Sequence, residues 1–147
     1  MCKRLTETTV WDDDWFYELP SEYKLFWFYI KDNCDHAGIW KPKIRSFKSA
    51  TDVDVDLDSA LISFNKGKQR IRILDCGYWY IEDFFYFQYA FKTKTMNLNN
   101  RVHHSIFNLY MVYGIPLSTV KGLSVMIPEK SDEKMSVIDF ESILGTI

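Results

Sequence analysis

Two strand-like strings on either side of a tight turn are the feature that most restricts how this chain can fold. The first string spans residues 70–74 (RIRIL) and the second spans residues 78–81 (YWYI), with only three residues between them. Isoleucine alternates with arginine in the first string, which is typical of a strand whose two faces differ. Gly77 supplies the residue that tolerates a positive φ in such a turn. The pattern predicts a β-hairpin with a short loop.

Helix-like segments precede this hairpin. Apolar residues recur at helical spacing in residues 44–50 and 57–65, and a longer segment of this kind covers residues 21–33. Residues 52–56 (DVDVD) alternate like an edge strand, but we interpret them as a turn in which Asp56 caps the following helix. With a short strand at Ile39-Trp40, the order is helix, strand, two helices and a two-stranded ribbon. This order predicts an α+β fold of the winged helix-turn-helix type over residues 21–91.

Three further segments are expected outside that domain. Residues 1–20 form an N-terminal arm, residues 92–122 contain a connecting segment and an additional C-terminal helix, and residues 123–147 form a tail. The helix, residues 101–113, either packs within the chain or forms a dimer seam, and fewer than three heptads favour packing within the chain. Its expected apolar face consists of Leu98, Val102, Ile106, Leu109 and Tyr113.

Composition excludes several classes of protein. The 147 residues fit one domain, and the odd number of cysteines, 3, fits a reducing compartment. No apolar run approaches the roughly 20 residues of a membrane span, and the N-terminus lacks the apolar core of a secretory signal. Glycine-rich phosphate loops, nucleophile elbows and HExxH motifs are absent from the sequence. We therefore expect a cytoplasmic protein that is not an enzyme, holds no cofactor or metal and does not contact a membrane.

The charges are grouped along the chain. The formal net charge is only -2, yet residues 21–50 carry 6 positive and 3 negative side chains, and residues 66–110 carry 7 and 3. Residues 51–65 carry no positive and 4 negative side chains. A positive face can therefore coexist with an acidic total.

Two of the basic groups flank the second helix of the predicted helix-turn-helix. In a winged helix both regions lie beside the groove-entering helix, so their cations can neutralise phosphates. The last residues of that helix are expected to approach the groove. The full set that we predict to bind nucleic acid is Lys41, Lys43, Arg45, Lys48, Asn65, Lys66, Lys68, Arg70 and Arg72.

The groove-entering helix itself gives little support to sequence-specific reading. Four aspartates, at positions 52, 54, 56 and 58, precede it or occupy its start, and its first turn lacks arginine and glutamine. Sequence-independent or shape-based binding of double- or single-stranded DNA therefore fits better. A winged helix that binds a protein or self-associates is the alternative, and a transcriptional regulator is a third hypothesis that would require sequence specificity.

Weaker constellations occur elsewhere. Residues 34–36 (CDH) are interpreted as a turn because their spacing is not that of a zinc site. Tyrosines 78, 80, 86 and 89 either stack on unpaired bases or belong to the core. A third basic group could hold a phosphate ahead of the last helix: Lys92, Lys94, Arg101, His103 and His104.

Several strings resemble one family. They are residues 11–16, the helix 21–33, residues 32–40 (DNCDHAGIW), residues 87–89 (FQY), residues 98–105 (LNNRVHHS) and residues 113–114. Together they resemble phage and prophage replication proteins of Bacteroides-type bacteria, whose N-terminal winged helix is similar to that of replisome organisers and DnaD-like primosome proteins. The resemblance covers roughly residues 8–122.

This resemblance implies a role at replication origins. It implies binding of origin or single-stranded DNA, self-association, and partnership with the replicative helicase or its loader. Family members commonly continue into a second, charged domain, which does not follow here before Ile147. We therefore expect the winged helix to be the main functional unit of this chain.

Overall fold

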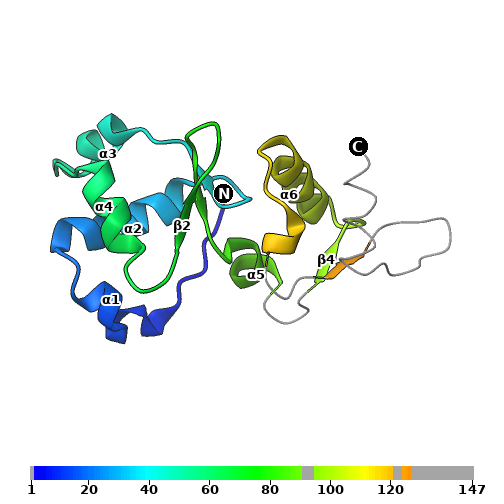
Figure 1. Cartoon of the computed structure of the whole chain (residues 1–147), viewed down its shortest axis with the longest axis horizontal. Helices are drawn as coiled ribbons and strands as arrows, with labels where there is room; N and C mark the ends of the chain where they lie inside the picture. The colour runs from blue at the N-terminus through cyan, green and yellow to red at the C-terminus, as the bar shows by residue number, and fades with distance from the viewer. Residues whose placement is uncertain (1, 91–94, 121–123, 127–147) are drawn as a thin grey trace. The chain divides into compact units, whose positions relative to one another are not determined.

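The computed structural model describes residues 2–90, 95–120 and 124–126, and these residues form an α+β protein. They divide into two units, one of residues 1–73 and 77–82 and the other of residues 74–76 and 83–147. Figure 1 shows the order of the elements along the chain. The predicted arm, residues 1–20, belongs to the first unit, and residues 83–90 belong to the second although we had placed them in the winged-helix domain.

The first unit begins with short helices. A 3₁₀ helix, η1 (Thr8–Asp12), and one turn of helix, α1 (Asp14–Tyr17), precede the longer α2 (Ser21–Asn33). The arm is held by its aromatic side chains, because Phe16 is fully buried and the Trp15 and Trp27 ring centroids lie 5.1 Å apart.

Two short helices and a small sheet follow. They are β1 (Ile39–Trp40), α3 (Ile44–Thr51), α4 (Leu57–Phe64), β2 (Ile71–Ile73) and β3 (Trp79–Ile81). All pairs in the sheet are antiparallel and the strand order is β1-β3-β2, with Trp40 opposite Trp79 and Arg72 opposite Tyr80. The predicted hairpin and helices are confirmed to within one or two residues.

Aromatic rings fill the core of this unit. Phe26 of α2 is fully buried, and its ring centroid lies 4.8 Å from that of Phe47, 5.5 Å from that of Trp40 and 6.1 Å from that of Phe64. Helical spacing places Phe47 and Phe64 on the inner faces of α3 and α4, so one ring on α2 joins both helices to β1. Ala50, which follows Phe47 by three residues in α3, is exposed.

The hairpin buries only one of its two expected isoleucines. Ile71 is 1% exposed, whereas Ile73 is 52% exposed although alternation puts both side chains on one face of the strand. Ile73 is the last residue of β2 and is paired with Trp79, the first residue of β3. Gly77 has a φ of +87°, as the short loop requires.

The second unit contains α5 (Phe84–Tyr89), β4 (Thr95–Asn97), α6 (Arg101–Val112), η2 (Leu117–Thr119) and β5 (Ser124–Met126). Strands β4 and β5 pair in parallel, which the sequence did not reveal. The Asn100 side chain accepts hydrogen bonds from the Val102 and His103 amides and so caps α6.

The buried stripe of α6 differs from the one predicted. Ile106 and Tyr110 are fully buried, but Val102, which we placed on the same face, is 45% exposed. Leu98 and Ile106 of the predicted face are buried, so the prediction is right in part, and the burial of Ile106 and Tyr110 agrees with the favoured packing within the chain. Apart from the residues of β5, the predicted tail 123–147 lies outside the described residues, as do Lys92 and Lys94.

Candidate nucleic-acid interface

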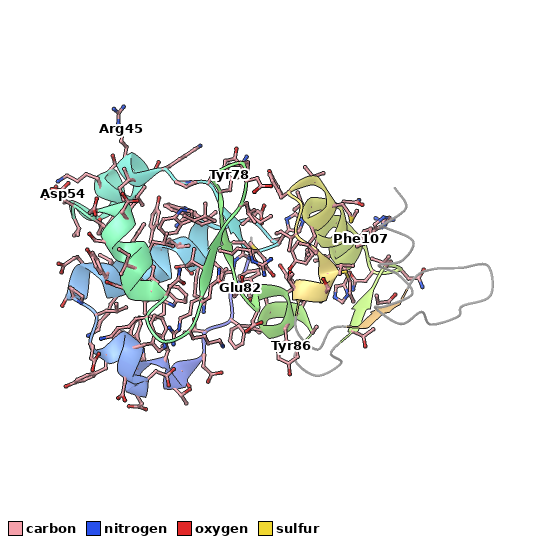
Figure 2. The ribbon with its side chains drawn as sticks, in the orientation of Figure 1. Arg45, Asp54, Tyr78, Glu82, Tyr86 and Phe107 are labelled. Atoms are coloured by element: carbon pink, nitrogen blue, oxygen red, sulfur yellow. The ribbon has the colours of Figure 1, made fainter. Side chains whose placement is uncertain are left out.

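The first predicted basic group lies on the segment that joins β1 to α3. Lys41, Lys43 and Arg45 are all exposed. Neither Lys43 nor Arg45 forms an ion pair with any residue that the structure describes. The Lys41 ammonium lies 5.6 Å from the Tyr78 ring centroid, so a cation–π contact ties this segment to the start of β3. In Figure 2 the Arg45 side chain extends outward from α3. We call these three residues the basic edge.

Lys48, the fourth member of this group, faces an aspartate. Its ammonium donates a hydrogen bond of 2.7 Å to Asp54 Oδ2 in the turn after α3, and this hydrogen bond raises the pKa of Lys48. The Asp54 side chain is 86% exposed, and Figure 2 shows it at the far end of α3 from Arg45. The acidic turn therefore adjoins Lys48 and neutralises it, and the basic edge ends before this residue.

Arg70 has a role within the fold. Its Nη1 donates hydrogen bonds to the carbonyl oxygens of Phe64, Lys66 and Lys68 at 3.1, 2.9 and 3.2 Å. The guanidinium also lies 4.0 Å from the Trp15 ring centroid, and desolvation lowers the pKa of Arg70. Unpaired carbonyls at a helix end need donors, and this side chain supplies them after α4. The structure thus gives Arg70 a structural contact in place of the phosphate contact that we predicted.

Asn65 also differs from its prediction. Its Oδ1 accepts hydrogen bonds from the backbone amides of Arg70 and Ile71, both at 2.8 Å, and its Nδ2 donates one of 3.1 Å to the Ile71 carbonyl. The amide group therefore joins the end of α4 to the start of β2. It orders the loop of residues 66–69 instead of approaching a groove.

Arg72 pairs with the carboxylate of the residue that follows β3. Nε and Nη2 donate hydrogen bonds of 2.6 and 2.9 Å to the two oxygens of Glu82, and the guanidinium lies 5.3 Å from the Tyr80 ring centroid. The two side chains are 22% and 15% exposed. Two parallel hydrogen bonds to one carboxylate hold the guanidinium firmly, so Arg72 cannot neutralise a phosphate without losing Glu82.

Lys66 and Lys68 remain on the surface of the loop between α4 and β2. Both are exposed, and the Lys66 ammonium lies 3.4 Å from Glu18 Oε2. That pair is weak because both side chains are mostly solvated, at 74% and 61% exposure. In the second predicted group, Lys66 and Lys68 are exposed, whereas Arg70 and Arg72 are half-buried.

The outer face of α4 carries no cation. Asp58, Ser59 and Ile62 are exposed on it, while Ala60 and Phe64 are buried. Asp56 accepts hydrogen bonds from the Ser59 amide and hydroxyl, which lower the pKa of this carboxyl and confirm the predicted cap. This face therefore repels a phosphate backbone.

The other candidates belong to the fold. Tyr80 is 1% exposed, so its ring is part of the core and does not form a stacking platform. Asp35 Oδ1 accepts hydrogen bonds from the Ala37 and Ile39 amides, and burial raises the pKa of the Cys34 thiol to about 11. These contacts are those of a turn. Among the described residues no group of three or more histidine, cysteine or acidic side chains is placed to hold a metal ion.

His103 makes a contact that requires its neutral form. Its Nδ1 accepts a hydrogen bond of 2.9 Å from the Asn97 amide, and its ring centroid lies 5.0 Å from that of Phe85. Burial lowers the pKa of His103. Because the folded chain then binds fewer protons than the unfolded chain, stability is complete above the ordinary pKa of about 6.5 and falls as the pH decreases towards the folded pKa.

We expect the free energy of unfolding to fall as the pH decreases below ~6.5, because the lowered pKa of His103 makes the folded chain bind fewer protons than the unfolded chain. Urea unfolding of the wild type and of His103→Gln at several pH values measures the difference. Other groups titrate equally in both proteins, so the wild type should have the steeper dependence. His104→Gln, at an exposed position of the same helix, is the control and should retain the wild-type slope.

No protein-family model, curated protein or solved structure matches the chain. Within the described parts of the chain, no helix is long and apolar enough to cross a membrane.

Proposed function

We propose that the first unit is a winged helix. The order α2, β1, α3, α4, β2, β3 and the antiparallel strand order β1-β3-β2 support this assignment. In such a domain α3 and α4 form the helix-turn-helix, and the loop between β2 and β3 is the wing. With only residues 74–78 between its strands, this wing is too short to reach far beyond the sheet.

We propose further that this domain binds DNA without catalysing a reaction, and that the basic edge contacts the phosphates. The observation that carries the proposal is the position of Lys43 and Arg45 at the N-terminus of α3, exposed and without an ion pair among the described residues. A helix N-terminus favours anions, and no acidic residue occupies the first turn of α3. Two cations at this position repel the helix dipole, and a bound phosphate relieves that repulsion.

The proposed contact is independent of sequence. The outer face of α4 lacks arginine, lysine and glutamine, so base edges have no reader there. Lys66 and Lys68 add phosphate contacts from the loop after α4, whereas Lys48, Asn65, Arg70 and Arg72 are excluded because their side chains serve the fold. The resemblance to phage replication proteins supports a role in replication initiation of a phage or mobile element.

The test is a charge reversal in the basic edge. Arg45→Glu should weaken binding of a fluorescein-labelled 20-base-pair duplex, measured by anisotropy, by roughly tenfold, because it removes one phosphate contact and adds a repulsion. Lys3→Glu, at an exposed position of the N-terminal arm outside every predicted basic group, changes the net charge equally and is the matched control. Its affinity should stay within about twofold of the wild type.

Salt provides a second measurement on the wild type. If about four lysine and arginine side chains meet phosphates, affinity should fall by roughly a hundredfold between 50 and 200 mM salt. Equal losses in Arg45→Glu and Lys3→Glu, or affinity that does not depend on salt, would contradict the proposal. A salt-insensitive protein that forms a tight oligomer in sedimentation experiments would instead support the alternative of an interaction or oligomerisation module.

A further inference from the structure

The outer face of α4 exposes an aliphatic side chain at its centre. Ile62 is 74% exposed, whereas Ala60 and Phe64, which point to the other side of the same helix, are fully buried. Asp58 lies one turn before Ile62 and Ser59 lies beside Asp58, and both are exposed. A helix of eight residues thus presents one large apolar group with nothing from the first unit covering it.

The segment before Ile62 is acidic. It contains Asp52, Asp54, Asp56 and Asp58, and residues 51–65 contain no lysine or arginine. Lys48 neutralises Asp54 in part, but the Asp54 side chain remains 86% exposed. An exposed isoleucine that follows an acidic segment disfavours binding of a polyanion. It is complementary to a partner surface that combines apolar and positive groups.

We propose that the outer face of α4 binds a basic amphipathic segment of another protein. An aliphatic side chain of that segment packs on Ile62, and a lysine or arginine side chain of the segment pairs with the exposed Asp58 one turn away. In such a contact the central apolar side chain supplies most of the affinity, and the charged side chains around it set the orientation of the partner. The site is separate from the basic edge, so this inference does not depend on DNA binding.

A second copy of the chain is the weaker occupant. Its basic edge offers the charges, but none of the large hydrophobic side chains exposed on the first unit lies between residues 41 and 45. The contact on Ile62 would then be missing. A partner that carries leucine and lysine on one helix supplies both groups.

The experiment uses the full chain and a defined probe. The probe is a fluorescein-labelled synthetic peptide in which leucine and lysine repeat at helical spacing, and anisotropy gives its affinity. Two control peptides replace every lysine by glutamate or shuffle the same residues so that no apolar stripe remains. We expect both controls to bind at least about tenfold more weakly than the probe.

Variants locate the contact on the protein. Ile62→Ser should weaken binding of the probe roughly tenfold, because burial of an isoleucine side chain is lost, and Asp58→Lys should weaken it further at low salt. Leu25→Ser removes a large exposed side chain from α2, which is 44% exposed, and is the matched control that should bind within about twofold of the wild type. Thermal unfolding checks that each variant is folded.

Three results would overturn the inference. The first is equal affinity of Ile62→Ser and Leu25→Ser for the probe, and the second is equal affinity of the wild type for the probe and the shuffled peptide. The third is concentration-dependent association of the chain in sedimentation that Ile62→Ser abolishes, since a second copy would then occupy the face. Ile62→Ser should keep wild-type affinity for the duplex, which separates this site from the proposed DNA contact.

Discussion

Replacing Arg72 by methionine is expected to lower the free energy of unfolding by about 3–5 kcal/mol. The substitution leaves the Glu82 carboxylate, which is 15% exposed, without the two hydrogen bonds that balance its desolvation. Urea unfolding followed by tryptophan fluorescence measures the loss.

The double variant Arg72→Met/Glu82→Leu distinguishes the loss of the ion pair from the cost of leaving the Glu82 carboxylate unpaired. With both charges removed and the volumes kept, most of the lost stability should return, because two apolar side chains need no partner. If the single variant loses less than about 1 kcal/mol, the pair is an ordinary surface ion pair. The double variant should also bind duplex DNA as the wild type does, which tests the exclusion of Arg72 from the interface.

Replacing Phe26 by alanine is expected to cost about 3–5 kcal/mol of stability. Its ring is fully buried and lies within 6.2 Å, centroid to centroid, of the rings of Trp40, Phe47, Phe64 and Trp79. No single neighbour can fill the cavity because each is held by its own helix or strand. The same unfolding experiment measures the effect.

Tyr17→Ala is the matched control for Phe26→Ala. Tyr17 is 71% exposed, and its ring contacts the Lys24 ammonium at 5.6 Å. Loss of such an exposed cation–π contact should cost less than about 1 kcal/mol. A comparable loss in both variants would mean that the aromatic core is not centred on Phe26.

Local pattern was sufficient for most elements of the first unit. Helical spacing in residues 57–65, the cap residue Asp56 and the glycine at position 77 act over a few residues, and each was found in the structure. In α6 the same reasoning found Ile106 but also selected the exposed Val102 and missed Tyr110, because Val102 and Ile106 have similar hydropathy and only packing distinguishes them. The parallel pairing of β4 with β5 was not predicted, because it joins residues far apart in sequence.

The candidate site was predicted in outline and corrected in its residues. Sequence identified which segments carry the cations, and the exposed Lys43 and Arg45 remain candidates. It could not show that Arg70 binds the carbonyls after α4 or that Arg72 pairs with Glu82, ten positions along the chain. The hairpin did indicate that residue 72 lies opposite the strand that ends just before Glu82. The strand register, which pairs Arg72 with Tyr80, was needed to identify Glu82 as the partner of Arg72.

The amino-acid sequence alone therefore determined the α+β class, the element order of the first unit and the positions of its basic and acidic segments. These properties depend on periodicity, capping and charge, which are local. Only the tertiary structure decided which cations remain available to a partner, because an arginine is equally suited to a phosphate, a carbonyl or a carboxylate. The choice among them is made by distance and burial, and both arise when α4, β2 and β3 come together.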